Sequence, residues 1–165
     1  MTFQPIPALR VLHDHGVRFV VIGGIAAQAH GSPIITHDLD ICYERTQDTM
    51  DRLAEALSEL NARLGGVDED VPFILDGKTI ASGDHFTFLT DVGSVDCLGT
   101  PSGAPGGYPQ LRPNAVTVEF DGLEVPIASI DDLIAMKRAA GRPKDLIEVE
   151  HLGALREELE ERGEL

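Results

Sequence analysis

The sequence predicts a single α/β domain on the strength of three observations. Apolar stretches of strand length alternate with segments in which apolar residues recur at helical spacing. The chain has 165 residues, which fits one domain and is long enough to bury a core. Gly23 and Gly24 directly follow the first apolar run and allow a sharp turn from a strand into a helix. We therefore expect residues 1–165 to fold as one unit.

The N-terminal part of the chain predicts three helices and two strands. A helical face formed by Ile6, Leu9 and Leu12 indicates the first helix. The elements expected there are a helix at 5–15, a strand at 18–23, a small-residue helix at 24–30, a strand at 39–44 and a helix at 48–63. The last of these has a continuous apolar stripe, made of Met50, Leu53, Ala54, Leu57, Leu60 and Leu64.

The C-terminal part predicts two hairpins followed by two helices. "FTFLTD" and "GSVDCLG" form the first hairpin, and "AVTVEFDGLEVPIA" the second, around the strong turn signal Asp121-Gly122. Ser129 is expected to cap a helix that ends near residue 140, and Pro143 to begin one that ends near 161. Residues 129–161 are thus a C-terminal helical part.

Residues 99–113, "GTPSGAPGGYPQLRP", differ from the rest in composition. Eight of these fifteen residues are Gly or Pro, so regular structure is not expected there. Two interpretations stay open: a mobile surface connection, or a loop that closes over a binding site.

Composition excludes several classes of protein. The chain has 28 acidic and 13 basic residues and a net charge of −15, whereas general nucleic-acid binders need a basic surface. We therefore expect no duplex DNA partner. The longest apolar run is interrupted by glycines and no signal-peptide pattern is present, so no membrane partner and a cytoplasmic location are expected. Cys42 and Cys97 lie in strand-like runs and are expected to be buried free thiols.

Three aspartates stand where strand cores usually carry apolar residues. Asp38 and Asp40 lie in "HDLDIC", and strand alternation places them on one face, about 6–7 Å apart along the chain. Asp96 lies in a second apolar strand, "GSVDCLG". Carboxylates at such spacing repel each other unless a cation lies between them, and Mg²⁺ or Mn²⁺ prefers such oxygen ligands. If the strands are neighbours, the three carboxylates converge on a metal site.

Two further features indicate a phosphate site beside this metal site. Gly23-Gly24 would direct the N–H groups at the start of a helix toward an anion. Four of the thirteen basic residues, Lys137, Arg138, Arg142 and Lys144, lie within the short segment "MKRAAGRPKD". In so acidic a chain, this basic cluster is a local exception that could receive a phosphate.

With these motifs in place, the sequence resembles the nucleotidyltransferase (polymerase-beta-like) superfamily. "VIGGIAAQAHGSPIITHDLDI", followed by the helix at 48–63 and later by "PIASIDDLIAMKRAAGRPKDLIEVEHL", is most similar to bacterial toxin-type nucleotidyltransferases of the AbiEii kind. The resemblance implies a mixed β-sheet flanked by helices. It further implies transfer of a nucleoside monophosphate from an NTP to an acceptor, with release of pyrophosphate.

The resemblance also implies roles for individual residues. Asp38, Asp40 and Asp96 match the metal ligands, with Asp96 also placed to accept the hydroxyl proton, and Gly23 and Gly24 match the turn that contacts phosphate. In this chain Gly24 replaces a serine that is common in the superfamily, and Ile34 and Ile35 stand where relatives often have an arginine. Both differences weaken the expected nucleotide site.

Lys137 follows Ile130, Leu133 and Ile134 on the apolar stripe of its helix, where a core residue is due. Two interpretations stay open: a lysine that extends to the rim, or one that points into a cavity and contacts phosphate, with assistance from Arg142. A Lys137→Met replacement is expected to leave the fold intact or slightly more stable, because a lysine on a core-facing stripe is costly to desolvate.

The acceptor is left open by the sequence. The toxin relatives imply a tRNA acceptor end and a cognate antitoxin as partner. The acidic balance favours a small cationic acceptor instead, as in aminoglycoside nucleotidyltransferases of the same superfamily. The two differences in the nucleotide site favour a third alternative, a non-catalytic nucleotide-binding or antitoxin-like partner.

Overall fold

The computed structural model describes residues 2–68 and 72–165. The described strands are β1 (Phe19–Ile22), β2 (Asp38–Tyr43), β3 (Arg63–Leu64), β4 (His85–Thr90), β5 (Gly93–Leu98), β6 (Val116–Phe120) and β7 (Leu123–Ile127). Within the described residues they form one seven-stranded sheet in the order β3-β4-β5-β2-β1-β7-β6. The sheet is mixed, because β2 runs parallel to β5 and β1 parallel to β7, while the other neighbours are antiparallel.

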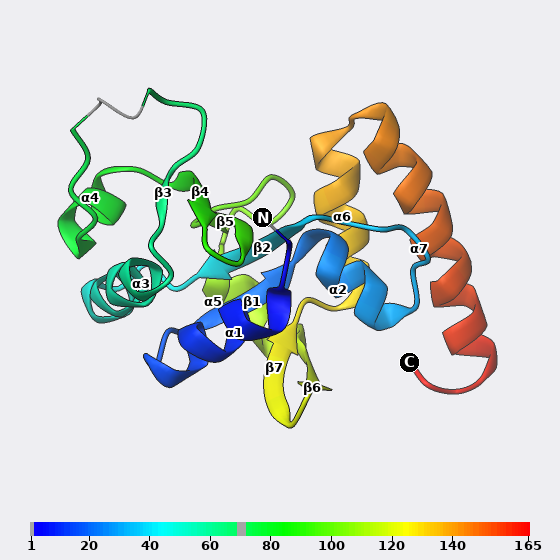
Figure 1. Cartoon of the computed structure of the whole chain (residues 1–165). Coiled ribbons are helices and arrows are strands. Elements are labelled where there is room, and N and C mark those ends of the chain that lie inside the picture. Colours follow the sequence, from blue (N-terminus) through cyan, green and yellow to red (C-terminus); the bar gives the residue numbers. More distant parts are fainter. Residues whose placement is uncertain (1, 69–71) are drawn as a thin grey trace.

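The described helices are α1 (Pro5–Asp14), α2 (Gly23–His30), α3 (Gln47–Glu59), α4 (Gly77–Ser82), α5 (Tyr108–Leu111), α6 (Ile130–Ala140) and α7 (Pro143–Glu161), with a 3₁₀ helix η1 (Arg112–Asn114). In Figure 1, α2, α6 and α7 lie on the right of the view, and α3 and α4 lie on the left. The predicted fold class, a single-domain mixed sheet flanked by helices, is confirmed. No helix in the described ranges is long and apolar enough to cross a membrane.

The core lies around β1 and β2. All four residues of β1 are buried, which is typical of a central strand covered on both faces. In β2, Leu39 and Ile41 are fully buried on one face, whereas Asp38 and Asp40 belong to the other. Cys42 and Cys97 are buried free thiols, as predicted. The carboxylates therefore lie on the sheet face opposite to that of Leu39 and Ile41.

The hairpins and caps follow the predicted local chemistry. In the β6–β7 turn, Asp121 and Gly122 have φ values of 50° and 81°, which is the conformation that a two-residue hairpin requires. The Ser129 side chain accepts a hydrogen bond from Asp132 N at 3.1 Å and caps α6. Pro143 occupies the first turn of α7.

The predicted helix at 48–63 is too long at its C-terminal end. Helix α3 ends at Glu59, and Asn61 adopts a left-handed conformation with φ of 54°. The chain then reverses so that Arg63 and Leu64 pair with β4 as the short strand β3. Helical periodicity could not reveal the pairing of β3 with β4, because Leu64 lies four residues after Leu60 and so continues the helical spacing of the apolar stripe. The short helices α4, α5 and η1 were not predicted.

Residues 99–107 form an irregular segment that packs against α6, and residues 108–114 are helical rather than irregular. Ala104 is buried, and a Cβ atom on Gly103 would lie only 2.6 Å from the backbone oxygen of Ala135 in α6. The close packing of Gly103 on α6 explains why glycine is needed there. Pro101 and Ser102 line a cavity next to Asp40, so this segment forms a wall of the site region.

Candidate active site

Asp40 and Asp96 are brought side by side by strand register. Asp40 is paired with Ile22 of β1 on one side and with Asp96 of β5 on the other. Because β2 and β5 are parallel and in this register, the two side chains project from the same face of the sheet. At the level of the sequence, only the family resemblance indicated that these two strands would be neighbours. The structure therefore places two of the three predicted carboxylates in contact.

The pairing has a strong electrostatic effect on Asp40. Burial, a hydrogen bond to Asp96 and the negative charges of Asp96 and Asp38 together raise the pKa of Asp40 to about 7, against an opposing effect of Lys137. Oδ1 of Asp96 is buried and has no hydrogen-bond partner among the described residues. Such an unsatisfied oxygen is costly, because a buried polar atom loses its water without compensation.

These features fit a divalent cation at Asp40 and Asp96. A cation between them would remove the repulsion and give the orphaned oxygen of Asp96 a partner. Asp38 lines the same cavity, but its side chain is exposed at the beginning of β2. Within residues 2–68 and 72–165, no three Asp, Glu, His or Cys side chains converge as a metal-binding group. Of the three carboxylates predicted to converge, only those of Asp40 and Asp96 are therefore in contact.

The two glycines stand where the chain passes from β1 into α2. Gly23 has a positive φ of 68°, and a Cβ atom there would overlap Oδ2 of Asp40. No side chain caps the start of α2, so its first N–H groups have no side-chain partner. Gly24 lines the cavity that contains the aspartates. Gly23 therefore lets the backbone approach Asp40 closely, and Gly24 borders the same cavity.

A cavity of about 310 Å³ joins the aspartates to the basic cluster. Its charged lining residues are Asp38, Asp40, Asp96, Lys137, Arg142, Lys144, Asp145 and Glu148. A second cavity of about 290 Å³, with apolar walls from Leu98, Leu133 and Met136, shares Asp40 and Lys137 with the first. A larger cavity of about 490 Å³ lies beside β3, but none of the predicted site residues line it. We therefore assign the site by the charged residues that line a cavity and not by the volume of the cavity.

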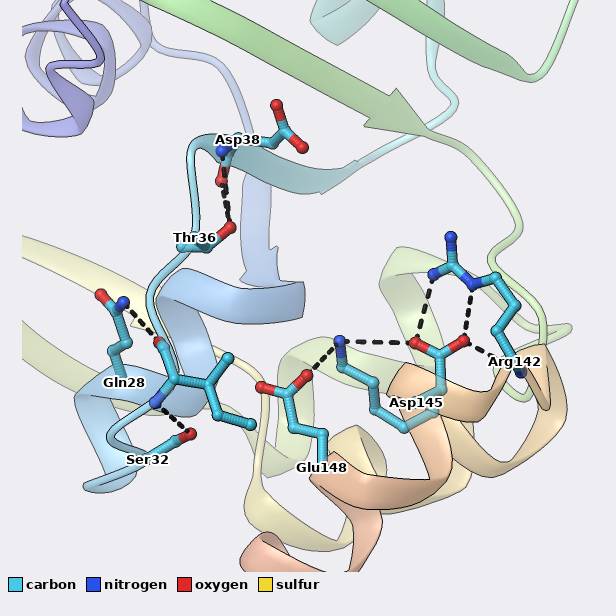
Figure 2. A network of polar contacts seen from close by, with 9 residues as sticks. Gln28, Ser32, Thr36, Asp38, Arg142, Asp145 and Glu148 are labelled. Atoms are coloured by element: carbon cyan, nitrogen blue, oxygen red, sulfur yellow. Dashed lines mark hydrogen bonds and ion pairs between the residues drawn. The ribbon is translucent and has the colours of Figure 1, made fainter.

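Lys137 belongs to a chain of ion pairs between α6 and α7. Its Nζ lies 2.8 Å from Oε2 of Glu148 and 3.8 Å from Oδ1 of Asp145. Asp145 in turn accepts a hydrogen bond from Nε of Arg142 at 2.6 Å (Figure 2). Asp145 is buried; burial raises its pKa, but the hydrogen bonds and charge of Arg142 outweigh this and lower it. Asp145 thus acts as a charged link between two cations.

These ion pairs change the expectation for Lys137. Its side chain is 16% exposed, so it is not a lysine that extends into solvent at the rim. It lines both cavities with Asp40, as expected of a lysine that points into a site. The sequence did not reveal Glu148 as its partner, although the spacing of Asp145 and Glu148 puts both on one face of α7. Lys137→Met would remove the positive charge that pairs with Asp145 and Glu148. We therefore expect this substitution to destabilise the fold rather than preserve it.

The segment before β2 is held by side-chain hydrogen bonds that were not predicted (Figure 2). Nε2 of Gln28 donates to the backbone oxygen of Ile34 at 2.8 Å, and the Ile34 N–H donates to Oγ of Ser32 at 3.3 Å. The Asp38 N–H donates to Oγ1 of Thr36 at 3.4 Å. These contacts fix the path of the chain from α2 to the aspartates.

Comparison with known proteins identifies the fold. No protein-family model and no curated protein matches the sequence. The structure is similar to the lincosamide antibiotic adenylyltransferase LnuA with lincomycin bound, with a TM-score of 0.64 and 11% identity over 94% of this chain and 99% of that chain. A putative nucleotidyltransferase from Thermotoga maritima has a TM-score of 0.53 and 20% identity, covering 97% and 96%. ANT(2'')-Ia in complex with adenylyl-2''-tobramycin has a TM-score of 0.54 and 14% identity, covering 94% of each chain.

The chain therefore has the nucleotidyltransferase fold over nearly its whole length. At identities of 20% or less, the likeness is one of fold. What the site does is inferred from its own residues.

Proposed function

We propose that the protein is a metal-dependent nucleotidyltransferase, which moves a nucleoside monophosphate from an NTP to an acceptor hydroxyl. The contact between Asp40 and Asp96, with the unpartnered Oδ1 of Asp96, carries this proposal. Such a pair is expensive in an empty site and favourable around a cation. The nucleotidyltransferase fold of the chain agrees with it.

Asp40 and Asp96 would hold Mg²⁺ or Mn²⁺, with Asp38 at the entrance of the same cavity. The cation would neutralise phosphate charge and orient the attacking hydroxyl. In the reaction, the acceptor oxygen forms a bond to the α-phosphorus while the bond to pyrophosphate breaks. Asp96 would accept the hydroxyl proton.

The phosphates would lie between the start of α2 and the basic residues of α6 and α7. Lys144 and Arg142 have exposed positions in the cavity, and Lys137 lies deeper, paired with Glu148. In phosphoryl transfer a protein mainly positions groups and neutralises charge, so these cations and the N–H groups at Gly24 would supply the protein's share.

Two acceptors are supported by different observations. The two-motif resemblance to AbiEii-type toxins favours a tRNA acceptor end and a role as the toxin of a toxin–antitoxin system. Two other observations favour a small acceptor such as a cationic antibiotic. The chain has a net charge of −15, and two of its structural neighbours were solved with lincomycin and with adenylyl-2''-tobramycin bound.

Incubation with α-³²P-labelled NTPs and Mg²⁺ tests the proposal against total RNA, aminoglycosides and protein. Labelled RNA selects the toxin, and labelled drug selects the small-molecule enzyme. NTP binding without any labelled product indicates a non-catalytic nucleotide-binding protein.

Variants of the site provide the controls for this assay. Asp40→Ala should abolish labelling, Asp38→Ala should reduce it, and Asp96→Asn should reduce turnover more than NTP affinity. Glu119→Gln, an exposed change on β6, should have no effect. Unchanged labelling in Asp40→Ala would refute the metal site.

A further inference from the structure

Two large apolar side chains are exposed at the cavity that contains the aspartates. Ile35 is 77% exposed and Ile147 is 56% exposed, and both line this cavity. A single exposed isoleucine needs no explanation, because folded proteins expose much apolar surface. Here two of them line one cavity whose other lining residues are mainly charged, so the cavity offers apolar contacts beside its charged groups.

Ile35 is held in its exposed position by the segment around it. The neighbouring residue Ile34 is fixed through both its backbone N–H and its backbone oxygen, by Ser32 and Gln28. On the other side, Thr36 is bonded to the Asp38 backbone (Figure 2). The exposure of Ile35 is therefore built into an ordered segment.

Ile147 is placed by the geometry of α7. It lies three residues after Lys144, so the two share a helix face and are separated by about 4.5 Å along the axis. Both are exposed, whereas Asp145 and Glu148 are buried. The helix thus presents a cation near its start and an apolar group one turn later. That order matches a ligand with an anionic end and an uncharged ring.

We infer that Ile35 and Ile147 hold the nucleobase of the NTP and do so without selecting among the four bases. The inference rests on the proposed function, since it assigns the donor of that reaction. Neither side chain can hydrogen-bond to a base edge. The amide nitrogen of Gln28 and the hydroxyl of Thr36 are engaged in holding the segment. An apolar site discriminates weakly between ligands of similar shape.

Isothermal titration calorimetry on the full chain with Mg²⁺ and no acceptor tests this assignment. Its probes are ATP, GTP, CTP, UTP and inorganic tripolyphosphate, which has no ring. The four NTPs should bind within about threefold of one another and more tightly than tripolyphosphate. Ile35→Ser and Ile147→Ser should each weaken NTP binding about tenfold and leave tripolyphosphate binding unchanged.

Ile74→Ser is the matched control, because Ile74 is 73% exposed and lines neither cavity. It should change no affinity. Three results overturn the inference while the proposed function stands: equal losses for NTP and tripolyphosphate, NTP affinities unchanged in the variants, or a strong preference of the wild type for one base. A change of oligomeric state in the variants without a change in NTP affinity assigns the isoleucines to a protein interface and also overturns it. If the wild type binds no NTP, the proposed function fails and the inference with it.

Discussion

Gly24 and Thr36 are in such close contact that only glycine fits at position 24. A Cβ atom there would lie 2.7 Å from Cβ of Thr36 and 2.9 Å from its Oγ1. Thr36 is in turn bonded to the backbone of Asp38, at the beginning of β2. Glycine at position 24 therefore has a steric cause in this chain. The approach of the segment before β2 excludes any side chain at position 24.

Gly24→Ser should thus destabilise the protein by about 2 kcal/mol, the usual cost of forcing extra atoms into a packed contact. Urea denaturation measures the loss. In a double-mutant cycle, Thr36→Gly should remove most of this cost, since it deletes the atoms that a new Cβ would meet. A fully additive cycle, or a Gly24→Ser variant as stable as the wild type, would contradict the steric explanation.

The raised pKa of Asp40 predicts that stability depends on pH in a defined direction. The carboxyl titrates near 3.8 when unfolded and at about 7 when folded, so the folded state binds the extra proton between these values. Without a divalent cation, stability should fall as pH rises from about 4 through 7, by roughly 2–4 kcal/mol in total. Asp40→Asn should lack this loss and be more stable than the wild type at pH 8.

Urea denaturation in EDTA over pH 5–8 tests this expectation. Glu119→Gln provides a matched loss of one exposed carboxylate and should follow the wild-type curve. Mg²⁺ at pH 8 should stabilise the wild type more than Asp40→Asn, because a ligand of the native state raises its stability. Parallel curves for the wild type and Asp40→Asn would show that Asp40 does not titrate as described.

Lys137→Met should affect both stability and ligand binding. Loss of the charge leaves the buried Glu148 unpaired, and breaking a buried ion pair on one side costs about 3 kcal/mol of stability. NTP affinity should also fall by roughly 1.5–3 kcal/mol if Lys137 contacts phosphate. Denaturation and calorimetry measure the two effects separately.

Arg138→Met is the control, since Arg138 is exposed and points about 100° away on α6. It should change stability by no more than about 0.5 kcal/mol. Adding Glu148→Gln to Lys137→Met should restore part of the lost stability, because it removes the unpaired charge. Equal losses of NTP affinity in Lys137→Met and Arg138→Met would indicate a diffuse effect of the basic cluster.

The sequence by itself determined most of the local elements and which candidate site residues share a strand face. Three local features agree with the structure because each depends on only a few neighbouring residues: the Asp121-Gly122 turn, the Ser129 cap and Pro143 in the first turn of α7. The shared face of Asp38 and Asp40 follows from strand alternation alone. Where local spacing continued past a real boundary, as at Leu64, the prediction was wrong.

Only the tertiary structure decided which of these groups meet. The contact of Asp40 with Asp96 depends on β2 and β5 being parallel neighbours in register, across more than fifty residues of chain. The partner of Lys137 depends on the packing of α7 on α6, and the exclusion of a side chain at Gly24 depends on the path of the segment before β2. Side-chain periodicity fixes the face of an element but not its neighbour, because pairing is set by the burial of the whole core.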